Sequence, residues 1–84
     1  MARYDIDTAT YPIDEATYDA VVDRFTYHAP KEGQPERYGA LRSKAKSMAL
    51  MITGECPPSV ERDLALAKLD SVVMHANAAI ARHE

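Results

Sequence analysis

The sequence lacks the features that identify secreted and membrane-spanning proteins. Its 84 residues include a single cysteine, Cys56, which excludes an internal disulfide framework and fits a reducing compartment. No apolar run approaches the roughly 18 residues of a membrane span, and the N-terminus lacks the apolar core of a signal peptide. We therefore expect a soluble cytoplasmic protein with no membrane partner.

The sequence motifs of common enzyme classes are also missing. There is no P-loop, no GxGxxG, no HExxH and no GxSxG. His28, His75 and His83 are scattered and have no cluster of other ligands beside them, so no metal site is expected. Cys56 has no histidine near it in the sequence and is interpreted as a small apolar residue filling a turn. We expect neither catalysis nor a cofactor.

Positive charge is scarce outside one segment of the chain. The formal net charge is −3, with −4 on residues 1–28, +3 on residues 29–53 and −2 on residues 54–84. Proteins that bind long nucleic acids are usually basic overall. An acidic chain would repel a polyanion except at its one basic segment. The charge distribution therefore favours a small anionic ligand and argues against polymeric nucleic acid.

The length allows one domain, and the hydrophobic core of such a domain is thin. Small domains without disulfides often gain the missing burial by forming oligomers. We expect residues 1–24 to form an acidic N-terminal segment that includes a short helix. Residues 25–84 are expected to form the main domain.

A short helix and a connector are predicted before the basic segment. Residues 1–12 are expected to be extended or loose, and Asp14 is a suitable N-cap for the helix that follows. Its apolar residues recur at helical spacing at Tyr18, Val21, Val22 and Phe25. Residues 26–34 predict a connector, since Pro30 and Gly33 interrupt any regular element.

A second helix is predicted from Pro35 to about Gly54. Pro35 suits a first helical turn, Glu36 suits the N-terminal dipole, and Pro57-Pro58 prevents continuation. One apolar arc of this helix comprises Tyr38, Leu41, Ala45, Met48, Ala49 and Ile52.

A third helix of about 24 residues, roughly 36 Å long, is predicted to start after the N-cap Ser59. It has two apolar seams. The first seam is Leu66, Leu69, Val73, Ala76 and Ile80, and the second is Ala67, Ser71, Met74, Ala78 and Ala81. The first can pack on the second helix, while the small residues of the second seam would let a helix of another chain approach. We predict an all-α fold, a short N-terminal helix and a long antiparallel helical hairpin, assembled as a symmetric homo-oligomer.

The cations of the basic segment border the apolar arc of the second helix. Arg42 and Lys46 lie on one flank, and Arg37 and Lys44 lie close together on the other. Water is partly excluded at the edge of a packed interface, so a phosphate contact there is stronger than on an open surface. These residues are candidate phosphate ligands.

Aromatic rings accompany these cations. Tyr27 and His28 stand in the connector, and Tyr38 begins the apolar arc of the second helix. Aromatic faces stack on nucleobases, which contributes roughly 1–3 kcal/mol per base. Rings beside cations are the two components of a nucleotide site. The alternative is that Tyr38 is a core residue and that the cations pair with acidic residues elsewhere, including Asp63 and Asp70.

Several motifs, taken in order, resemble a known family. They are FTYHAP at 25–30, GQPERY at 33–38, CPPS at 56–59, LALAKL at 64–69 and MHANAAIAR at 74–82. Together they resemble the phage-encoded hairpin proteins that act as sponges for immune signalling nucleotides, the anti-CBASS sponges and their anti-Thoeris relatives. The resemblance covers about residues 25–83.

The resemblance implies an oligomer, a hexamer in relatives, that binds cyclic di- or trinucleotides in the host bacterial cytoplasm without cleaving them. It implies that Tyr27 stacks on a base between protomers and that Arg42 or Lys46 contacts phosphate. Arg62 and Lys68, on the third helix, are implied candidates for a trinucleotide site where several protomers meet. Alternative readings are a sponge for cyclic ADP-ribose signals, a helical module that docks on a protein, and an enzyme that degrades the nucleotide.

Overall fold

The computed structural model describes residues 8–84, and within this range the chain forms three α-helices and no strand. The helices are α1 (Glu15–Arg24), α2 (Gln34–Glu55) and α3 (Val60–His83). The predicted all-α class is confirmed. Of the segment expected to be extended or loose, residues 1–7 lie outside the described residues, and residues 9–14 form neither helix nor strand. The division into segments 1–24 and 25–84 stays a prediction.

The helix starts are set by local capping. Asp14 Oδ1 accepts a hydrogen bond of 2.7 Å from the Thr17 backbone N–H, and this bond lowers the pKa of Asp14. Ser59 Oγ likewise accepts from the Arg62 N–H at 3.1 Å. The N-cap of α2 is Gly33, whose φ of 82° lies in the left-handed region that glycine adopts without strain. Both side-chain caps stand where the sequence predicts them.

The end of α2 differs from the expectation. Gly54 was expected to follow the helix, but α2 continues through it to Glu55 and ends at the C-cap Cys56. Gly54 therefore occupies an ordinary helical position, and Gly33 is the one described glycine with a positive φ. Pro57-Pro58 is what stops the helix, because proline has no N–H to donate. Cys56 is exposed, so the interpretation that it fills the turn is wrong.

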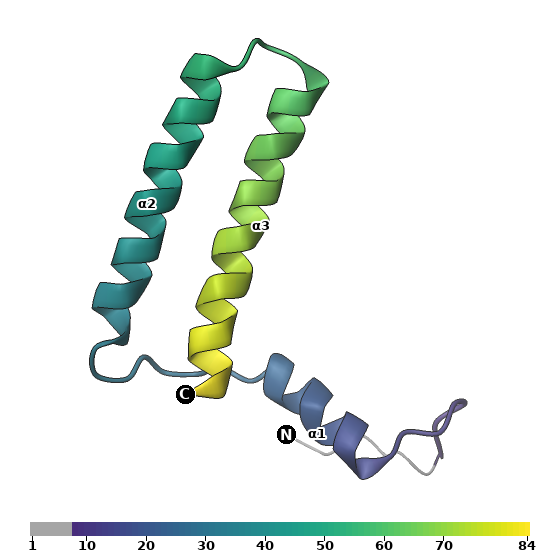
Figure 1. Cartoon of the computed structure of the whole chain (residues 1–84). Coiled ribbons are helices and arrows are strands. Elements are labelled where there is room, and N and C mark those ends of the chain that lie inside the picture. Colours follow the sequence, from purple (N-terminus) through teal and green to yellow (C-terminus); the bar gives the residue numbers. More distant parts are fainter. Residues whose placement is uncertain (1–7) are drawn as a thin grey trace.

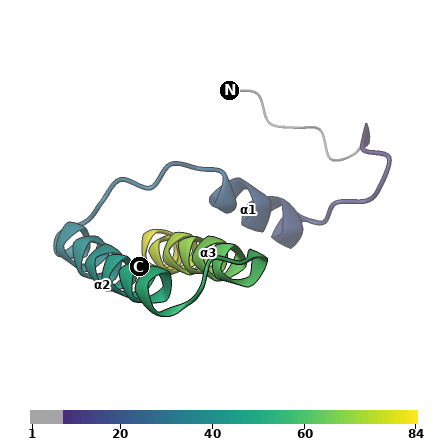
Figure 2. The ribbon, with the colours of Figure 1, turned by 90° about the horizontal axis from the view of Figure 1, so that it is seen from above.

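The hairpin of α2 and α3 stands apart from α1. The two long helices run antiparallel and side by side, joined at one end by the short proline turn (Figure 1). At the open end, the connector between α1 and α2 crosses the C-terminal end of α3. Viewed along the hairpin, α1 and α2 lie on opposite sides of α3 (Figure 2). This crossing brings three segments together near the last turns of α3.

The packing between α2 and α3 follows the predicted seams. The first seam of α3 is half-buried or buried throughout, at Leu66, Leu69, Val73, Ala76 and Ile80. On α2, the half-buried members of the arc are Tyr38, Ala45, Ala49 and Ile52. Leu41 and Met48 lie at the edge of the contact, with exposures of 37% and 49%. A two-helix contact covers only this one stripe of each helix.

A single chain therefore has almost no core. Among the described residues only Ile80 and Gln34 are buried. Large apolar side chains that remain exposed include Leu50, Met51, Leu64, Val72 and Met74. The described chain measures 54 × 35 × 19 Å with a radius of gyration of 18.3 Å, against about 12 Å for a compact domain of this length. The fold presents its apolar surface outward.

By length and composition alone, α3 is long and apolar enough to cross a membrane. This 24-residue helix contains an 18-residue window with a mean hydropathy of 1.2 and at most two charged residues. One such helix is weak evidence for a membrane span, and the window is not an uninterrupted apolar run. The window includes Lys68 and Asp70, and core helices of soluble proteins pass the same test.

Candidate functional site: a groove where the connector crosses the hairpin

A groove lies at the open end of the hairpin, where the connector crosses α3. Its volume is ≈ 450 Å³. The end of α1 and the connector contribute Arg24, Thr26, Tyr27 and His28. The hairpin contributes Tyr38 and Arg42 from α2 and Asn77, Ala78, Ala81 and Arg82 from α3. We call this the crossing groove. It gathers four of the sequence-predicted site residues: Tyr27, His28, Tyr38 and Arg42.

The aromatic residues of the crossing groove differ in how firmly they are held. Tyr27 is 84% exposed, so its ring is open to a ligand. His28 is half-buried, and its Nε2–H donates a 3.0 Å hydrogen bond to the backbone carbonyl of Asp23. Tyr38 is also half-buried and donates through its hydroxyl to Gln34 Oε1 at 3.5 Å. The ring of Tyr27 is thus exposed, whereas the rings of His28 and Tyr38 are held by hydrogen bonds.

Three arginines surround the same groove. Arg42 comes from α2, whereas Arg24 ends α1 and Arg82 lies in the last turn of α3. Arg82 Nη2 donates a 3.0 Å hydrogen bond to the Arg24 carbonyl, which holds the end of α1 against α3. No carboxylate lines the groove among the described residues. Its charge is therefore positive, and it suits an anionic ligand that also has flat rings.

Two further grooves carry the remaining helix-two cations. One has a volume of ≈ 430 Å³ and follows the α2–α3 seam, with Arg42, Lys46 and Asp70 among its lining residues. Arg42 borders both this groove and the crossing groove. The other, of ≈ 540 Å³, is lined by Arg37 and Lys44 around apolar residues. The structure therefore separates the two flanks of α2 into different grooves.

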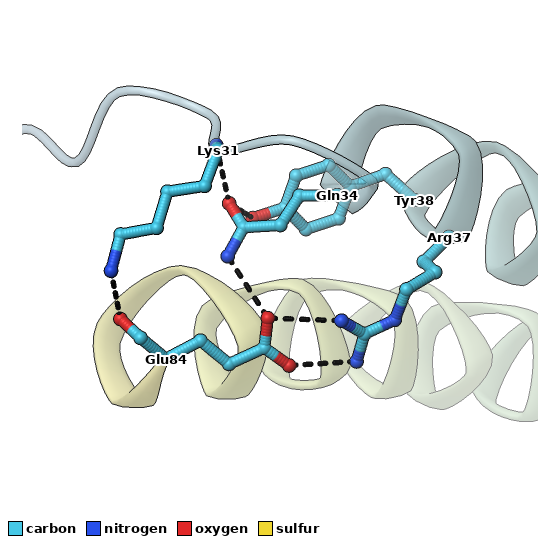
Figure 3. A network of polar contacts seen from close by, with 5 residues as sticks. All are labelled: Lys31, Gln34, Arg37, Tyr38 and Glu84. Atoms are coloured by element: carbon cyan, nitrogen blue, oxygen red, sulfur yellow. Dashed lines mark hydrogen bonds and ion pairs between the residues drawn. The ribbon is translucent and has the colours of Figure 1, made fainter.

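Arg37 is engaged in a network around Glu84 (Figure 3). Its Nη1 and Nη2 donate to Glu84 Oε1 and Oε2 at 2.9 and 2.7 Å. Gln34 Nε2 donates to Oε1 at 3.0 Å, and Lys31 Nζ donates to the Glu84 backbone oxygen. The Arg37 hydrogen bonds, followed by that of Gln34, hold the pKa of Glu84 below its usual value. Arg37 thus ties the start of α2 to the end of α3.

Arg62 and Lys68 lie away from the crossing groove. Arg62 Nη1 donates to the backbone carbonyls of Thr53 and Cys56 at 3.2 and 3.3 Å, so this side chain closes the proline turn at the opposite end of the hairpin. Lys68 is exposed on α3. Neither residue lines a groove with Tyr27 in a single chain.

The described residues offer no alternative metal centre. Within residues 8–84, no group of three or more histidine, cysteine, aspartate or glutamate side chains could hold a metal ion. His75 Nδ1–H donates to the Ser71 carbonyl at 2.8 Å within its own helix. The groove chemistry is therefore that of rings, guanidinium groups and amides.

Sequence reasoning missed Arg24, Asn77 and Arg82. Arg24 ends α1, just before the connector, and Asn77 and Arg82 lie on α3, far in the sequence from the basic segment; the connector crossing α3 brings them into one groove. Arg82 lies in the last turn of α3, where a cation is expected for reasons of the helix dipole alone. No local pattern separates that role from a place in a ligand site.

Comparison with known proteins identifies the class of this fold. The Acb2/Tad1 hairpin domain matches residues 18–81, a range that includes most of α1, the connector, α2 and nearly all of α3. The chain therefore belongs to the Acb2/Tad1 hairpin family, the family of anti-CBASS and anti-Thoeris sponges that the motifs resemble. No curated protein and no solved structure matched the chain.

Proposed function

We propose that this protein binds and sequesters cyclic oligonucleotide second messengers without cleaving them, and so blocks the activation of CBASS-type effectors. Family membership supports an anti-defence sponge role. The main support for a nucleotide ligand is the crossing groove, which is lined by the exposed ring of Tyr27 and by three arginines. Such a protein would be encoded by a phage and act in the cytoplasm of the infected bacterium.

The proposed binding mode follows from the chemistry of the groove. Tyr27 stacks on a base, which contributes roughly 1–3 kcal/mol per base. Guanidinium groups bind phosphate oxygens with paired, charge-assisted hydrogen bonds. Arg42 is the first candidate for this contact, because it lines the groove with Tyr27, whereas Lys46 lies one turn further along the hairpin. Arg24 and Arg82 add positive charge on the opposite side.

We further propose that a second copy of the chain completes the site. The groove opens to solvent in a single chain, with Tyr27 84% exposed. Exposed apolar residues along α3, including Val72 and Met74, need a partner, and closed symmetry supplies one without an added protein. We propose a hexamer. Walls contributed by several chains would enclose a ligand on more sides than one chain can.

Cyclic dinucleotides fit the crossing groove best, because one ring and a cluster of arginines match one base and its phosphates. A cyclic trinucleotide such as cyclic tri-adenylate is proposed to bind elsewhere, at a junction of protomers formed by α3. Arg62 and Lys68 are the candidates there. A cyclic ADP-ribose-type Thoeris signal has the same purine and phosphate chemistry and is the alternative ligand.

A retention experiment tests the proposal. The protein is incubated with a panel of cyclic di- and trinucleotides and cyclic ADP-ribose isomers, filtered, heat-denatured, and the released ligand is analysed by chromatography. We expect intact ligand to appear only after denaturation. Degraded ligand would indicate an enzyme. A ligand that stays free and unchanged throughout would overturn the nucleotide function and favour a module that docks on a protein.

Two charge-reversal variants test which groove binds the phosphate. Arg42→Glu replaces a groove arginine and is expected to abolish dinucleotide retention. Lys46→Glu makes a similar change of charge one helical turn away, outside the crossing groove, and is expected to retain ligand. Loss of retention in Lys46→Glu alone would assign phosphate binding to the neighbouring groove.

A further inference from the structure

Asn77 is the unusual residue of the crossing groove. It lies on α3 beside the small residues Ala78 and Ala81. Its Oδ1 is buried and has no hydrogen-bond partner among the described residues. A buried carbonyl oxygen without a donor is costly, so a native structure normally supplies a partner. Asparagine is also a weaker helix former than alanine, which could occupy the same position. We therefore expect the Asn77 oxygen to accept a hydrogen bond from a donor that lies outside the single chain.

Tyr27 is exposed and is assigned to stacking, and the remaining neutral or titratable side chains of the groove are already bonded to the protein. Thr26 Oγ1 donates to the Val22 carbonyl at 2.6 Å. His28 and Tyr38 donate to Asp23 and to Gln34, as described above. The Asn77 carboxamide thus stands out as the side chain with both a donor and an acceptor to offer. The terminal torsion of asparagine is broad, so rotation can turn the oxygen toward the groove.

We propose that Asn77 recognises adenine, and that the crossing groove prefers cyclic oligonucleotides that contain adenine. This proposal rests on the proposed nucleotide-binding function. The adenine N6 amino group and N7 form a donor and an acceptor side by side, which a carboxamide matches with two hydrogen bonds. The corresponding edge of guanine, O6 and N7, has two acceptors and leaves the Asn77 oxygen unpartnered. Ala78 and Ala81 leave room beside the amide for a flat base.

Isothermal titration at one salt concentration tests this assignment. The affinities of the cyclic dinucleotides with two adenines and with two guanines are compared for the parent protein, Asn77→Ala and Asn77→Asp. A bidentate base contact changes discrimination by roughly 5- to 150-fold. We expect the parent to prefer the adenine ligand by that factor and Asn77→Ala to bring the ratio close to one. Asn77→Asp, which only accepts hydrogen bonds, loses the donor to N7 but can still accept from the adenine N6 amino group, so it is expected to bind the adenine ligand more weakly than the parent and not to favour guanine.

Ser71→Ala is the matched control, because Ser71 is an exposed polar residue of the same helix outside the crossing groove. It is expected to leave the ratio unchanged. Equal affinities in the parent, or a ratio that Asn77→Ala does not move, would overturn the assignment while the sponge function stands. If neither these nor the other panel ligands bind the parent, both proposals fail.

Light scattering of Asn77→Ala is the second readout. A changed mass with an unchanged affinity ratio would assign the Asn77 oxygen to a contact between chains and overturn the assignment.

Discussion

Tyr27 lies on the connector between α1 and α2, and its aromatic side chain is 84% exposed to water. A single exposed aromatic residue is common on protein surfaces. Tyr27 differs because it lies at the rim of a groove with three arginines and no carboxylate within the described part of the chain. A base stacked on this ring would be held beside groups that bind its phosphates. A stacked base would therefore bury more of the Tyr27 ring than the rest of the chain does.

Tyr27→Ala is expected to weaken nucleotide binding by about 5- to 150-fold, the equivalent of roughly 1–3 kcal/mol for one stacked base. Titration calorimetry with the best ligand of the panel measures the change. Tyr11→Ala is the matched control, because Tyr11 is 80% exposed but lies outside the crossing groove. It should leave affinity unchanged. Equal losses in both variants would show that the ring of Tyr27 has no special part in binding.

Some of these site residues can be predicted from the sequence, whereas others are recognised only in the structure. Tyr27, His28 and Arg42 stand close together in one basic segment, and the structure brings them into one groove. Arg24 and Asn77 come from other elements. Their place depends on the path of the connector across α3, a tertiary feature that neither helical periodicity nor composition contains. Local patterns thus identify the residues that one segment supplies, and folding adds the rest.

At the scale of the elements, the connector is held at both of its ends by the last turns of α3. Arg82 bonds the carbonyl of Arg24 at the end of α1. The Glu84 side chain bonds Arg37 and Gln34 at the start of α2. The crossing groove lies between these two attachments, so they determine where Tyr27 stands relative to Arg42. Loosening the Glu84 attachment would disturb the groove without removing a residue that lines it.

The Glu84 attachment predicts a pH dependence of stability. The pKa of Glu84 is lowered from 4.5, chiefly by the Arg37 hydrogen bonds. A carboxylate with a lower pKa in the folded state stabilises the fold above its unfolded pKa and loses this effect as the pH falls through its folded pKa. Glu84→Gln is therefore expected to lower the Tm modestly at about pH 7, with the difference from the parent closing below about pH 4.

Thermal unfolding followed by circular dichroism across this pH range measures the effect. Glu55→Gln provides the control, because Glu55 is an exposed residue at the opposite end of the hairpin. Its Tm should follow that of the parent at every pH. A gap between Glu84→Gln and the parent that stays constant with pH would mean that the carboxylate charge does not stabilise the connector.

Helix boundaries show why elements are easier to predict than their ends. Asp14 and Ser59 both cap where expected, since a side chain that accepts a backbone N–H three residues on is a local interaction. The end of α2 was misjudged because Gly54 is compatible with a helical interior as well as with a left-handed stop. Arg62 donates to the carbonyls of Thr53 and Cys56, on either side of that glycine, a contact that requires the turn to be formed first.

At the scale of the whole molecule, the exposed apolar surface supports the proposed assembly with other copies of the chain. A hairpin covers one stripe of each helix, and α3 remains apolar enough to pass a membrane-span test with none of that window buried. Monomeric proteins rarely expose contiguous apolar surface of this kind. Copies of the same chain are the partner that the small residues of the second seam favour, since Ala67 and Ser71, which lie outside the crossing groove, allow close approach of a helix.

The oligomer can be broken by a charge on this seam. Met74 is 65% exposed on α3, and Met74→Glu would place a carboxylate in the predicted contact, which is costly without a partner charge. Light scattering after size exclusion should give a multiple of 9.3 kDa for the parent and a smaller mass, with lower helix content, for the variant. Glu61→Lys reverses the charge at an exposed position in the first turn of the same helix and should keep the parent mass. A parent protein that elutes at 9.3 kDa would contradict the assembly and leave the crossing groove to bind its ligand from one side alone.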